Sequence, residues 1–323
     1  MQKKLAVVIL NWNGKTWLEE FLPSVVRFSQ QSDIYVIDNF STDDSVAFLK
    51  HHFPQVKIIK NDKNYGFAGG YNEGLKHIDH EIYCLLNSDV EVTENWTEPV
   101  LELFEKNQEI SAVQPKILSF DRKNYFEFAG AAGGLIDNLG YPYCRGRIFD
   151  DVEEDFGQYD DENEIFWASG CCFFIRSQDF HAQRGFDERF FAHQEEIDLC
   201  WRLINSGKKI FYTGKSKVYH VGGGTLNKQS AKKTFLNMRN NLSMLVKNMP
   251  FPNMIFVIFA RLCLDGLAAI YFGYKYGFSH FWAVGKAHFA FYTQIPGTWK
   301  RRQKHQKHKF YQSKWLIFKH FLK

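Results

Sequence analysis

Cysteine is scarce in this sequence, and its spacing argues against the common cysteine-based sites. The six cysteines of the 323-residue chain form no Cys-x-x-Cys pair and no regular framework. Most of them lie within apolar runs, which favours reduced, buried thiols in a cytosolic setting. We therefore expect no structural zinc site.

The sequence also lacks the glycine patterns that bind dinucleotides and nucleoside triphosphates. Its glycines at positions 66, 69, 70 and 74 do not have the spacing Gly-x-Gly-x-x-Gly, and no phosphate-loop lysine follows them. Nicotinamide and phosphate-loop chemistry are therefore disfavoured. We expect these glycines to allow a helix to pack closely beneath a ligand.

Acidic residues are almost absent from the C-terminal end of the chain. Residues 250–323 contain 12 Lys and Arg but only one acidic residue, Asp265, whereas residues 1–249 contain 28 basic and 35 acidic residues. A basic end on an acidic body suggests an anionic partner for the end only.

This C-terminal end has no uninterrupted apolar run for a clean transmembrane helix, which needs roughly 20 predominantly apolar residues. Residues 251–292 are aromatic and apolar, but Arg261 and Asp265 interrupt them at a spacing that would let the two charges pair on one helix face. The basic and aromatic residues 300–323 favour a helix that lies in a membrane interface on anionic lipid. Nucleic-acid binding and a solvated tail are the less favoured alternatives, and whether residues 251–292 span or lie on the membrane stays open.

From the N-terminus onward, strand-like and helix-like segments alternate, which predicts an α/β fold with a mostly parallel sheet flanked by helices. The first apolar stretch is followed by Asn11 and has no small-residue cleavage site, so we interpret it as a strand and not as a signal peptide. The expected strands are Leu5 to Leu10, Ile34 to Asp38, Val56 to Lys60 and Glu81 to Leu86, with helices from about Thr16, Asp43 and Ala68.

Between Asp121 and Glu164 the glycine pairs and an acidic tract predict long loops with short strands, the tract being a solvated loop and not a metal cage. Regular structure is expected again in "EIFWASGCCFFIRS", a buried strand, and in "EEIDLCWRLINSG", a helix that Gly207 ends. We divide the chain into an α/β domain of residues 1–249 and an aromatic, basic helical segment of residues 250–323.

Polar clusters follow each of the four expected strands, where an open α/β sheet binds its ligands. The clusters begin at Asn11, at Asp38 and Asn39, at Asn61 with Asn64 close behind, and at Asn87. Asp38 could accept hydrogen bonds from a ribose or a base, although a lone strand-end Asp is more often a cap or turn residue. Asn39 and the hydroxyls after it offer donors at a helix start, which suits an anion.

The cluster Asn87-Ser88-Asp89 is a candidate metal site. Asp89 is a hard oxygen ligand of the kind that binds Mg²⁺ or Mn²⁺ together with substrate phosphates, and Asn87 would point to the same side of an extended chain. In isolation this tripeptide is more often a turn.

A second acidic cluster places His193, Glu195, Glu196 and Asp198 around the first turn of a helix. The helix dipole favours acids there whatever the function, but the same field keeps a carboxylate ionised, as a general base must be. His220 ends a further strand just before a glycine run, and its importance depends on where the fold places it.

In chain order, the motifs resemble those of the family 2 inverting glycosyltransferases with a GT-A fold, especially bacterial rhamnosyltransferase-like members. The resemblance covers about residues 4–245. Its motifs are "VVILNWNG", "VIDNFSTDDS", "NYGFAGGYNEG", "LLNSDVEV", "ASGCCFFIR", "GFDERFFAHQEEIDLCWRLINSGKKI" and "VYHVGGGT". Seven motifs in sequence order form a specific pattern.

The resemblance implies that Asp38 binds the base or ribose of a nucleotide sugar and that Asp89 and His220 approach a Mg²⁺ or Mn²⁺ ion. It places Glu196 where the family's general base is usually an Asp, and Glu195 is the alternative base. Asn87 stands where the family has a first carboxylate. An inverting transfer needs such a base and a Lewis acid for the departing diphosphate, but no covalent intermediate.

These implications predict a glycosyltransferase that moves a sugar from dTDP-rhamnose or a UDP-sugar to a lipid-linked or polysaccharide acceptor. We expect it at the inner face of the bacterial plasma membrane, without a nucleic-acid partner. A non-catalytic nucleotide-sugar-binding or scaffold relative is the main alternative. A nucleotidyltransferase ranks last, because only Lys15 is available for a basic loop after the first strand. The sequence leaves open whether the chain forms a homo-oligomer.

Overall fold

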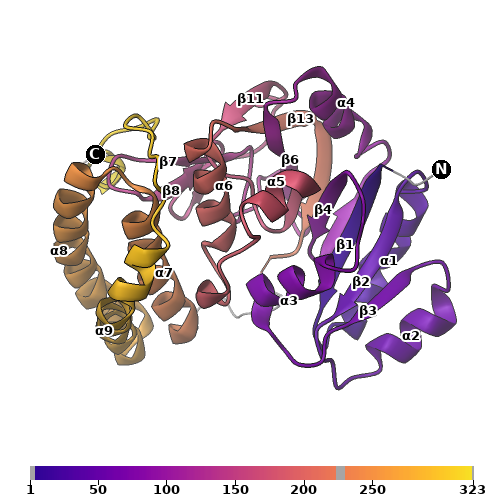
Figure 1. The fold of residues 1–323 in the computed structure, drawn as a ribbon, viewed down its shortest axis with the longest axis horizontal. Coiled ribbons are helices and arrows are strands. Elements are labelled where there is room, and N and C mark those ends of the chain that lie inside the picture. The colour runs from indigo at the N-terminus through magenta and orange to yellow at the C-terminus, as the bar shows by residue number, and fades with distance from the viewer. Residues whose placement is uncertain (1–3, 223–229, 322–323) are drawn as a thin grey trace.

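The computed structural model describes residues 4–222 and 230–321, and a nine-stranded sheet forms the centre of this part of the chain (Figure 1). The sheet order is β11-β13-β6-β12-β4-β1-β2-β3, and β5 pairs with β13. The first four sequence-predicted strands are confirmed as β1 (Leu5–Asn11), β2 (Asp33–Asp38), β3 (Lys57–Lys60) and β4 (Ile82–Leu86). The helices between them are α1 (Lys15–Phe28), α2 (Ser45–His52) and α3 (Gly66–Leu75).

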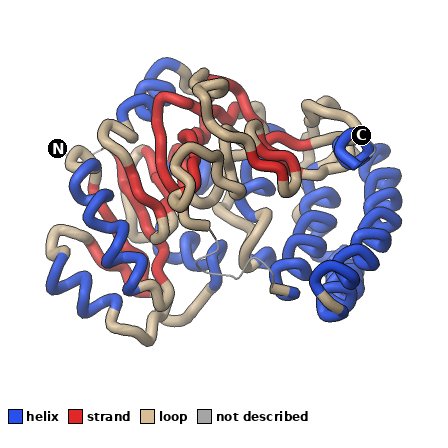
Figure 2. The backbone as a smooth tube through the Cα atoms, turned by 180° about the vertical axis from the view of Figure 1, so that it is seen from behind, coloured by secondary structure: helices blue, strands red, loops and turns tan. Residues whose placement is uncertain are grey.

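Strands β1 and β4 lie at the middle of the sheet because their side chains are apolar on both faces. Val7 and Val8 are both fully buried, but they belong to two different hydrophobic clusters, one on each side of the sheet. Because side chains alternate along a strand, helices on both faces are needed to cover such a run. Figure 2 shows helices on both sides of these strands.

The four strands β1 to β4 are parallel as expected, and the second half of the sheet adds antiparallel strands that make it a mixed sheet. Strand β12 (Cys172–Arg176) runs antiparallel to both β4 and β6 (Ile110–Ser119). Strand β13 (Lys209–His220) is parallel to β6 but antiparallel to β5 (Val90–Val92). The helices here are α4 (Glu98–Lys106), α5 (Ser177–Ala182), the short 3₁₀ helix η1 (Glu188–Phe190) and α6 (Glu195–Asn205).

The segment expected as one buried strand, "EIFWASGCCFFIRS", forms two. Its first residues end β11 (Glu162–Ile165), which pairs with β13, and its last residues form β12 in another part of the sheet. A turn separates them, in which the Cys172 N–H donates to the Ser169 carbonyl over 3.3 Å. The single-strand prediction was wrong because composition does not reveal this turn.

The segment between β6 and β11 forms a small sheet of four short strands. They are β7 (Gly134–Ile136), β8 (Pro142–Cys144), β9 (Arg147–Ile148) and β10 (Asp151–Val152). The acidic tract is only partly solvated, because the buried Lys116 ammonium forms ion pairs with Asp155 and Asp160. All six cysteines are free thiols and five are buried, as expected; Cys263 is exposed.

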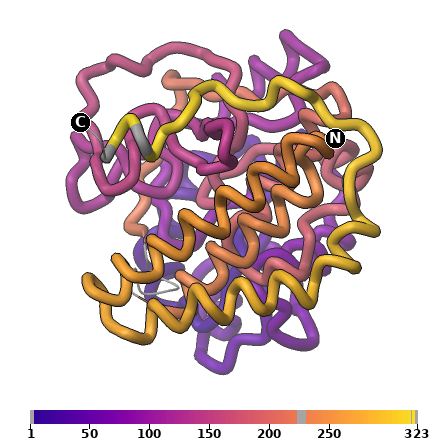
Figure 3. The backbone as a smooth tube through the Cα atoms, turned by 90° about the vertical axis from the view of Figure 1, so that its left-hand side faces the viewer, coloured from indigo at the N-terminus to yellow at the C-terminus, as the bar shows by residue number. Residues whose placement is uncertain are grey.

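Three long helices form the C-terminal end of the molecule: α7 (Ala231–Asn248), α8 (Phe251–Tyr276) and α9 (Phe278–Lys300). Figure 3 shows α8 and α9 side by side as an outer layer, with the final residues running along its edge. Gly207 has a φ of 92° just after α6, as expected for a helix-ending glycine. Helices α8 and α9 make up most of the C-terminal segment that was expected to be helical, and the basic tail after them is mostly irregular, with the short helix α10 (Leu316–Phe321) among its described residues.

Candidate functional site

Strand pairing brings Asp89 and His220 together although 131 positions separate them in the sequence. Val90 lies opposite His220 where β5 pairs with the end of β13, so Asp89 just before Val90 faces the same end. The His220 Nε2 atom lies 3.2 Å from Asp89 Oδ1, and its Nδ1 atom lies 3.3 Å from Glu127 Oε2. The Asn87 amide nitrogen lies 3.5 Å from His220 Nε2.

Two carboxylates therefore flank one imidazole in a buried cluster. Burial alone would lower the pKa of His220, but Cys171, Glu127 and Asp89 together raise it well above its ordinary value. Burial also raises the pKa of the Cys171 thiol to about 12, so the carboxylates are the charged neighbours that favour the imidazolium. The sequence analysis did not include Glu127, because it lies in a loop without a local motif.

The donor atoms of this cluster fit a divalent cation that is shared with a ligand. Within the described part of the chain, no three His, Cys, Asp or Glu side chains are grouped so that they could hold a metal ion by themselves. Asp89 offers a carboxylate, and His220 can offer Nε2 once that nitrogen has lost its proton, while its Nδ1 stays beside Glu127. Asn87 can offer its amide oxygen after rotation, since the amide orientation follows only from hydrogen bonding. Such partial coordination is typical of Mg²⁺ held together with substrate phosphates.

The loops after β1 and β2 contain two buried oxygens that lack a partner among the described residues: Asn11 Oδ1 and Asp38 Oδ1. The other polar atom of each side chain is bound to Ser41, whose hydroxyl accepts from Asn11 Nδ2 over 3.2 Å and whose N–H donates to Asp38 Oδ2 over 3.3 Å. Because buried polar atoms normally have hydrogen-bond partners, the free oxygens indicate a missing polar ligand.

Gly14 links this loop to the Asn87-Ser88-Asp89 tripeptide. A Cβ atom at Gly14 would lie 2.6 Å from Asn11 Oδ1 and 3.7 Å from Ser88 Oγ. Only glycine permits this close approach without displacing Asn11. The candidate nucleotide loop and the candidate metal cluster are therefore neighbours.

Asn39 and Asn64 fix the loop after β3. Asn39 Nδ2 donates to Asn64 Oδ1 over 3.1 Å and to the Gly66 carbonyl over 3.0 Å, and its Oδ1 accepts from Asn61 over 2.9 Å. Asn64 Oδ1 also accepts from the Gly66 N–H over 2.8 Å. These bonds join the end of β2 to the start of α3.

The two glutamates at the start of α6 lie in different environments. Glu195 is only 4% exposed, and burial together with the charge of Glu196 raises its pKa well above the ordinary value. Glu196 is half-buried, and burial raises its pKa to about 7 against opposing backbone hydrogen bonds. Burial therefore favours the neutral form of Glu195, whereas the pKa of Glu196 lies near neutral pH.

Gly170 and Cys171, in the turn before β12, lie between Glu196 and the metal cluster. The Glu196 carboxyl carbon lies 4.0 Å from where a Cβ atom of Gly170 would be. The next residue, Cys171, accepts a hydrogen bond at its carbonyl from the Asn87 N–H over 2.9 Å. Glu196 and Asn87 thus lie against adjacent residues of the same turn.

The segment that leads into α6 has a strained backbone. Phe191, His193 and Gln194 have φ values of 65°, 69° and 73°, which non-glycine residues rarely adopt. The side-chain amide of Asn240 on α7 donates to the carbonyls of Phe190, Ala192 and His193 at 3.0, 2.9 and 2.8 Å. Sequence reasoning missed Asn240, because a polar residue within a helix carries no signal of its partners.

The other residues of the acidic cluster do not share the environment of Glu196. Asp198 is completely buried and accepts from Arg202 over 2.8 Å, from Lys247 over 2.7 Å and from Asn248 over 2.8 Å, so it joins α6 to α7. Burial, with a smaller contribution from Lys233, lowers the pKa of His193 to about 4. Gly223, Gly224 and Thr225 of the expected glycine run lie outside the described residues.

The strand order and the similarity to solved structures define the fold as a GT-A fold. The particular family follows from the sequence. Residues 6–181 match the model of "Glycosyl transferase family 2", so the chain belongs to this family. The predicted fold and family are confirmed.

Relatives of known name agree with this assignment. The chain is 23% identical over 236 residues to the N-acetylglucosaminyl-diphospho-decaprenol L-rhamnosyltransferase of Mycobacterium tuberculosis, covering 68% of this chain and 76% of the relative. Its fold is similar to that of GalNAc-T7, solved with UDP, GalNAc and Mn²⁺ (TM-score 0.60, 17% identity, covering 77% of this chain but only 49% of that one). The mannosyltransferase PcManGT from Pyrobaculum calidifontis, solved with GDP-Man and Mn²⁺, is also similar (TM-score 0.54, 11% identity, coverage 92% and 76%).

Proposed function

We propose that this protein is an inverting glycosyltransferase that moves a rhamnosyl or hexosyl group from a nucleoside-diphosphate sugar to a lipid-linked or polysaccharide acceptor. One arrangement carries the proposal. Glu196 and Asn87 lie against adjacent residues of one turn, and Asp89 and His220 lie beside Asn87. The rhamnosyltransferase relative, whose name includes a diphospho-decaprenol acceptor, supports dTDP-rhamnose as the first donor to test and UDP-sugars as the next.

Asp38 and Asn11 would bind the nucleoside part of the donor through their free oxygens. Asn39 and Asn64 would act indirectly by holding the loop in shape. Asp89 and His220, with Asn87, would hold Mg²⁺ or Mn²⁺, which when bound would neutralise charge on the departing diphosphate.

Glu196 is the base that we propose for the acceptor hydroxyl. Its pKa of about 7 suits proton abstraction near neutral pH, and the residue is half-buried, whereas Glu195 is buried. Glu195 is less suitable, since burial raises its pKa well above the ordinary value and so disfavours the ionised form that a base needs. As the hydroxyl oxygen attacks the anomeric carbon, Glu196 takes its proton and the bond to the diphosphate breaks.

The C-terminal helices would attach the enzyme peripherally to the cytoplasmic face of the membrane, where a lipid-linked acceptor is accessible. Among the described residues, α8 is the one helix long and apolar enough to cross a membrane by length and composition. The exposed apolar side chains of α8 and α9 support membrane contact.

The test is a screen of dTDP-rhamnose and common UDP-sugars with purified protein, Mn²⁺ or Mg²⁺ and lipid-linked acceptors, with product detected by mass spectrometry. We expect transfer from one donor and its loss in Glu196→Gln. A scaffold protein would instead bind a nucleotide sugar without turning it over, and Glu196→Gln would then leave binding and cellular function unchanged.

A further inference from the structure

The hairpin of α8 and α9 presents an apolar face on the outside of the molecule. Phe259, Leu267 and Ile270 on α8 are 69%, 65% and 64% exposed. Trp282, Phe289 and Tyr292 on α9 are also exposed and repeat at helical spacing. We call these six residues the outer apolar face. Phe259 and Tyr292 of this face also line an apolar groove of about 280 Å³ between the first half of α8 and the second half of α9.

The opposite side of the hairpin carries buried polar groups that bind the rest of the protein. Arg261 and Asp265 are 2% and 1% exposed and lie 3.5 Å apart, which confirms the predicted pair. Arg261 also donates to Asn241 on α7 over 2.6 Å and to the Leu139 carbonyl over 3.2 Å. The two sides of α8 are therefore different, as in helices that lie in an interface.

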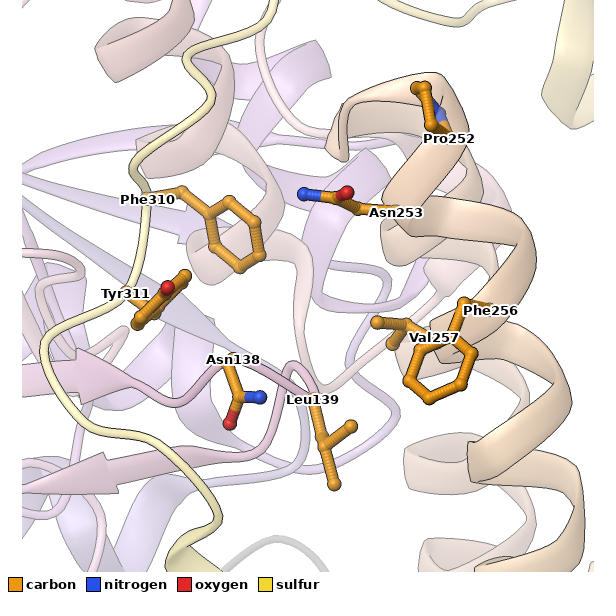
Figure 4. Close-up of a pocket in the computed structure, with 8 residues that line it drawn as sticks. All are labelled: Asn138, Leu139, Pro252, Asn253, Phe256, Val257, Phe310 and Tyr311. Carbon is orange, nitrogen blue, oxygen red and sulfur yellow. The ribbon is translucent and has the colours of Figure 1, made fainter.

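Both ends of α8 are attached to the same α/β domain. At its start, two residues connect it to α7, and Phe256 and Val257 line an open pocket of about 260 Å³ together with Asn138 and Leu139 of that domain (Figure 4). At its end, the Lys275 ammonium lies 3.5 Å from the carboxylate of Asp150, between β9 and β10.

The first turn of α9 is attached as well, because His280 Nδ1 lies 2.9 Å from the hydroxyl of Thr234 at the start of α7. The 26 residues of α8 extend about 39 Å, which is longer than the roughly 30 Å of bilayer hydrocarbon. A spanning α8 would carry its far end to the other side of the membrane. Here that end lies beside the domain from which the helix starts.

We propose that the hairpin lies flat in the membrane surface and that the outer apolar face enters one leaflet without crossing it. The partner is a bilayer that contains anionic lipid. Charge complementarity supports this choice, since residues 250–323 have 12 Lys and Arg against one acidic residue and the tail lysines 304, 309 and 314 are exposed. Trp282 and Tyr292 suit the headgroup level, where one side of an aromatic ring is apolar and the other is hydrated.

This inference rests on the membrane attachment in the proposed function, and its test measures depth instead of activity. Cys263 lies halfway along α8 and is the one exposed cysteine, so an environment-sensitive maleimide fluorophore labels it selectively. On phosphatidylglycerol–phosphatidylcholine vesicles, we expect quenchers near the headgroup to act more strongly than quenchers near the chain ends. Stronger quenching from the bilayer centre would mean a spanning helix and would overturn the proposal.

The contact face is tested by substitution. Phe259→Ser combined with Ile270→Ser should lower the vesicle partition coefficient at least about tenfold, because two large apolar side chains are lost from the leaflet. Phe156→Ser is the matched control, since Phe156 is 80% exposed but lies in the acidic loop. Equal loss in both variants would refute the assigned face, as would a stable dimer in buffer that shields Phe259 and does not bind vesicles. Donor turnover is measured separately, so a failed activity screen leaves this result interpretable.

Discussion

The ionisation of Glu196 predicts a specific pH dependence of sugar transfer. Its carboxyl has a pKa of about 7 because burial disfavours the charged form, and the base must be ionised to accept a proton. The rate should therefore rise with pH and level off above the pKa. At pH 6 about one molecule in ten carries the ionised base, so kcat should be about a tenth of its plateau value.

Two isosteric variants separate Glu196 from its neighbour. Glu196→Gln should reduce kcat by about 10²- to 10⁴-fold, which is the usual contribution of a general base. Glu195→Gln should retain most of the activity, because burial raises the pKa of this carboxyl and favours its neutral form, which the amide resembles.

The assay is initial-rate transfer between pH 5.5 and 8.5 at saturating donor, with Mn²⁺ held constant and nucleotide binding measured at each pH. Binding is the control, since a general loss of structure would weaken it as well. A flat profile across pH 7 in the wild-type protein, or greater loss in Glu195→Gln than in Glu196→Gln, would refute the reasoning.

Three further predictions follow from other contacts. Asp89→Ala should lower metal-dependent turnover at least about a hundredfold and weaken Mn²⁺ binding seen by calorimetry, with the melting temperature nearly unchanged. Asp198→Ala should lower the free energy of unfolding by about 3–5 kcal/mol in urea titrations, because it leaves the buried Lys247 ammonium without one of its carboxylates. Asn240→Leu should lower kcat and shift the acid limb of the pH profile while the donor KM stays unchanged. The reason is that the backbone before Glu196 loses its hydrogen bonds to the Asn240 amide. An unchanged pH profile would mean that Asn240 only stabilises the fold.

Local sequence patterns predicted the first half of the fold well. The strands β1 to β4 and the helices between them follow from apolar runs and helical periodicity, which depend on neighbouring residues. The division of "EIFWASGCCFFIRS" into β11 and β12 could not be predicted in this way. Which neighbour a strand pairs with depends on residues far away, such as those of β13.

The candidate site shows the same limit. Residue type and strand-end position were enough to select Asp38, Asp89 and His220, but Glu127 meets His220 only through the tertiary fold. The sequence placed Glu196 at the position of the base and left Glu195 open as the alternative. Their pKa values differ because the two side chains are buried to different degrees. Neighbouring residues of a helix point in different directions, so burial can change sharply from one residue to the next.

The buried pair in α8 changes how the C-terminal segment should be tested. In the sequence, Arg261 and Asp265 appear as interruptions of an apolar helix, but in the fold Arg261 holds Asn241, which in turn donates to Gln194 Oε1 over 3.3 Å. Deleting residues 250–323 would therefore remove Arg261, the partner of the buried Asn241. Asn241 contacts Gln194, which directly precedes Glu195. Loss of activity in such a truncation could come from this contact alone. Substitutions on the outer apolar face leave that contact in place, so they separate membrane attachment from the geometry of the candidate base.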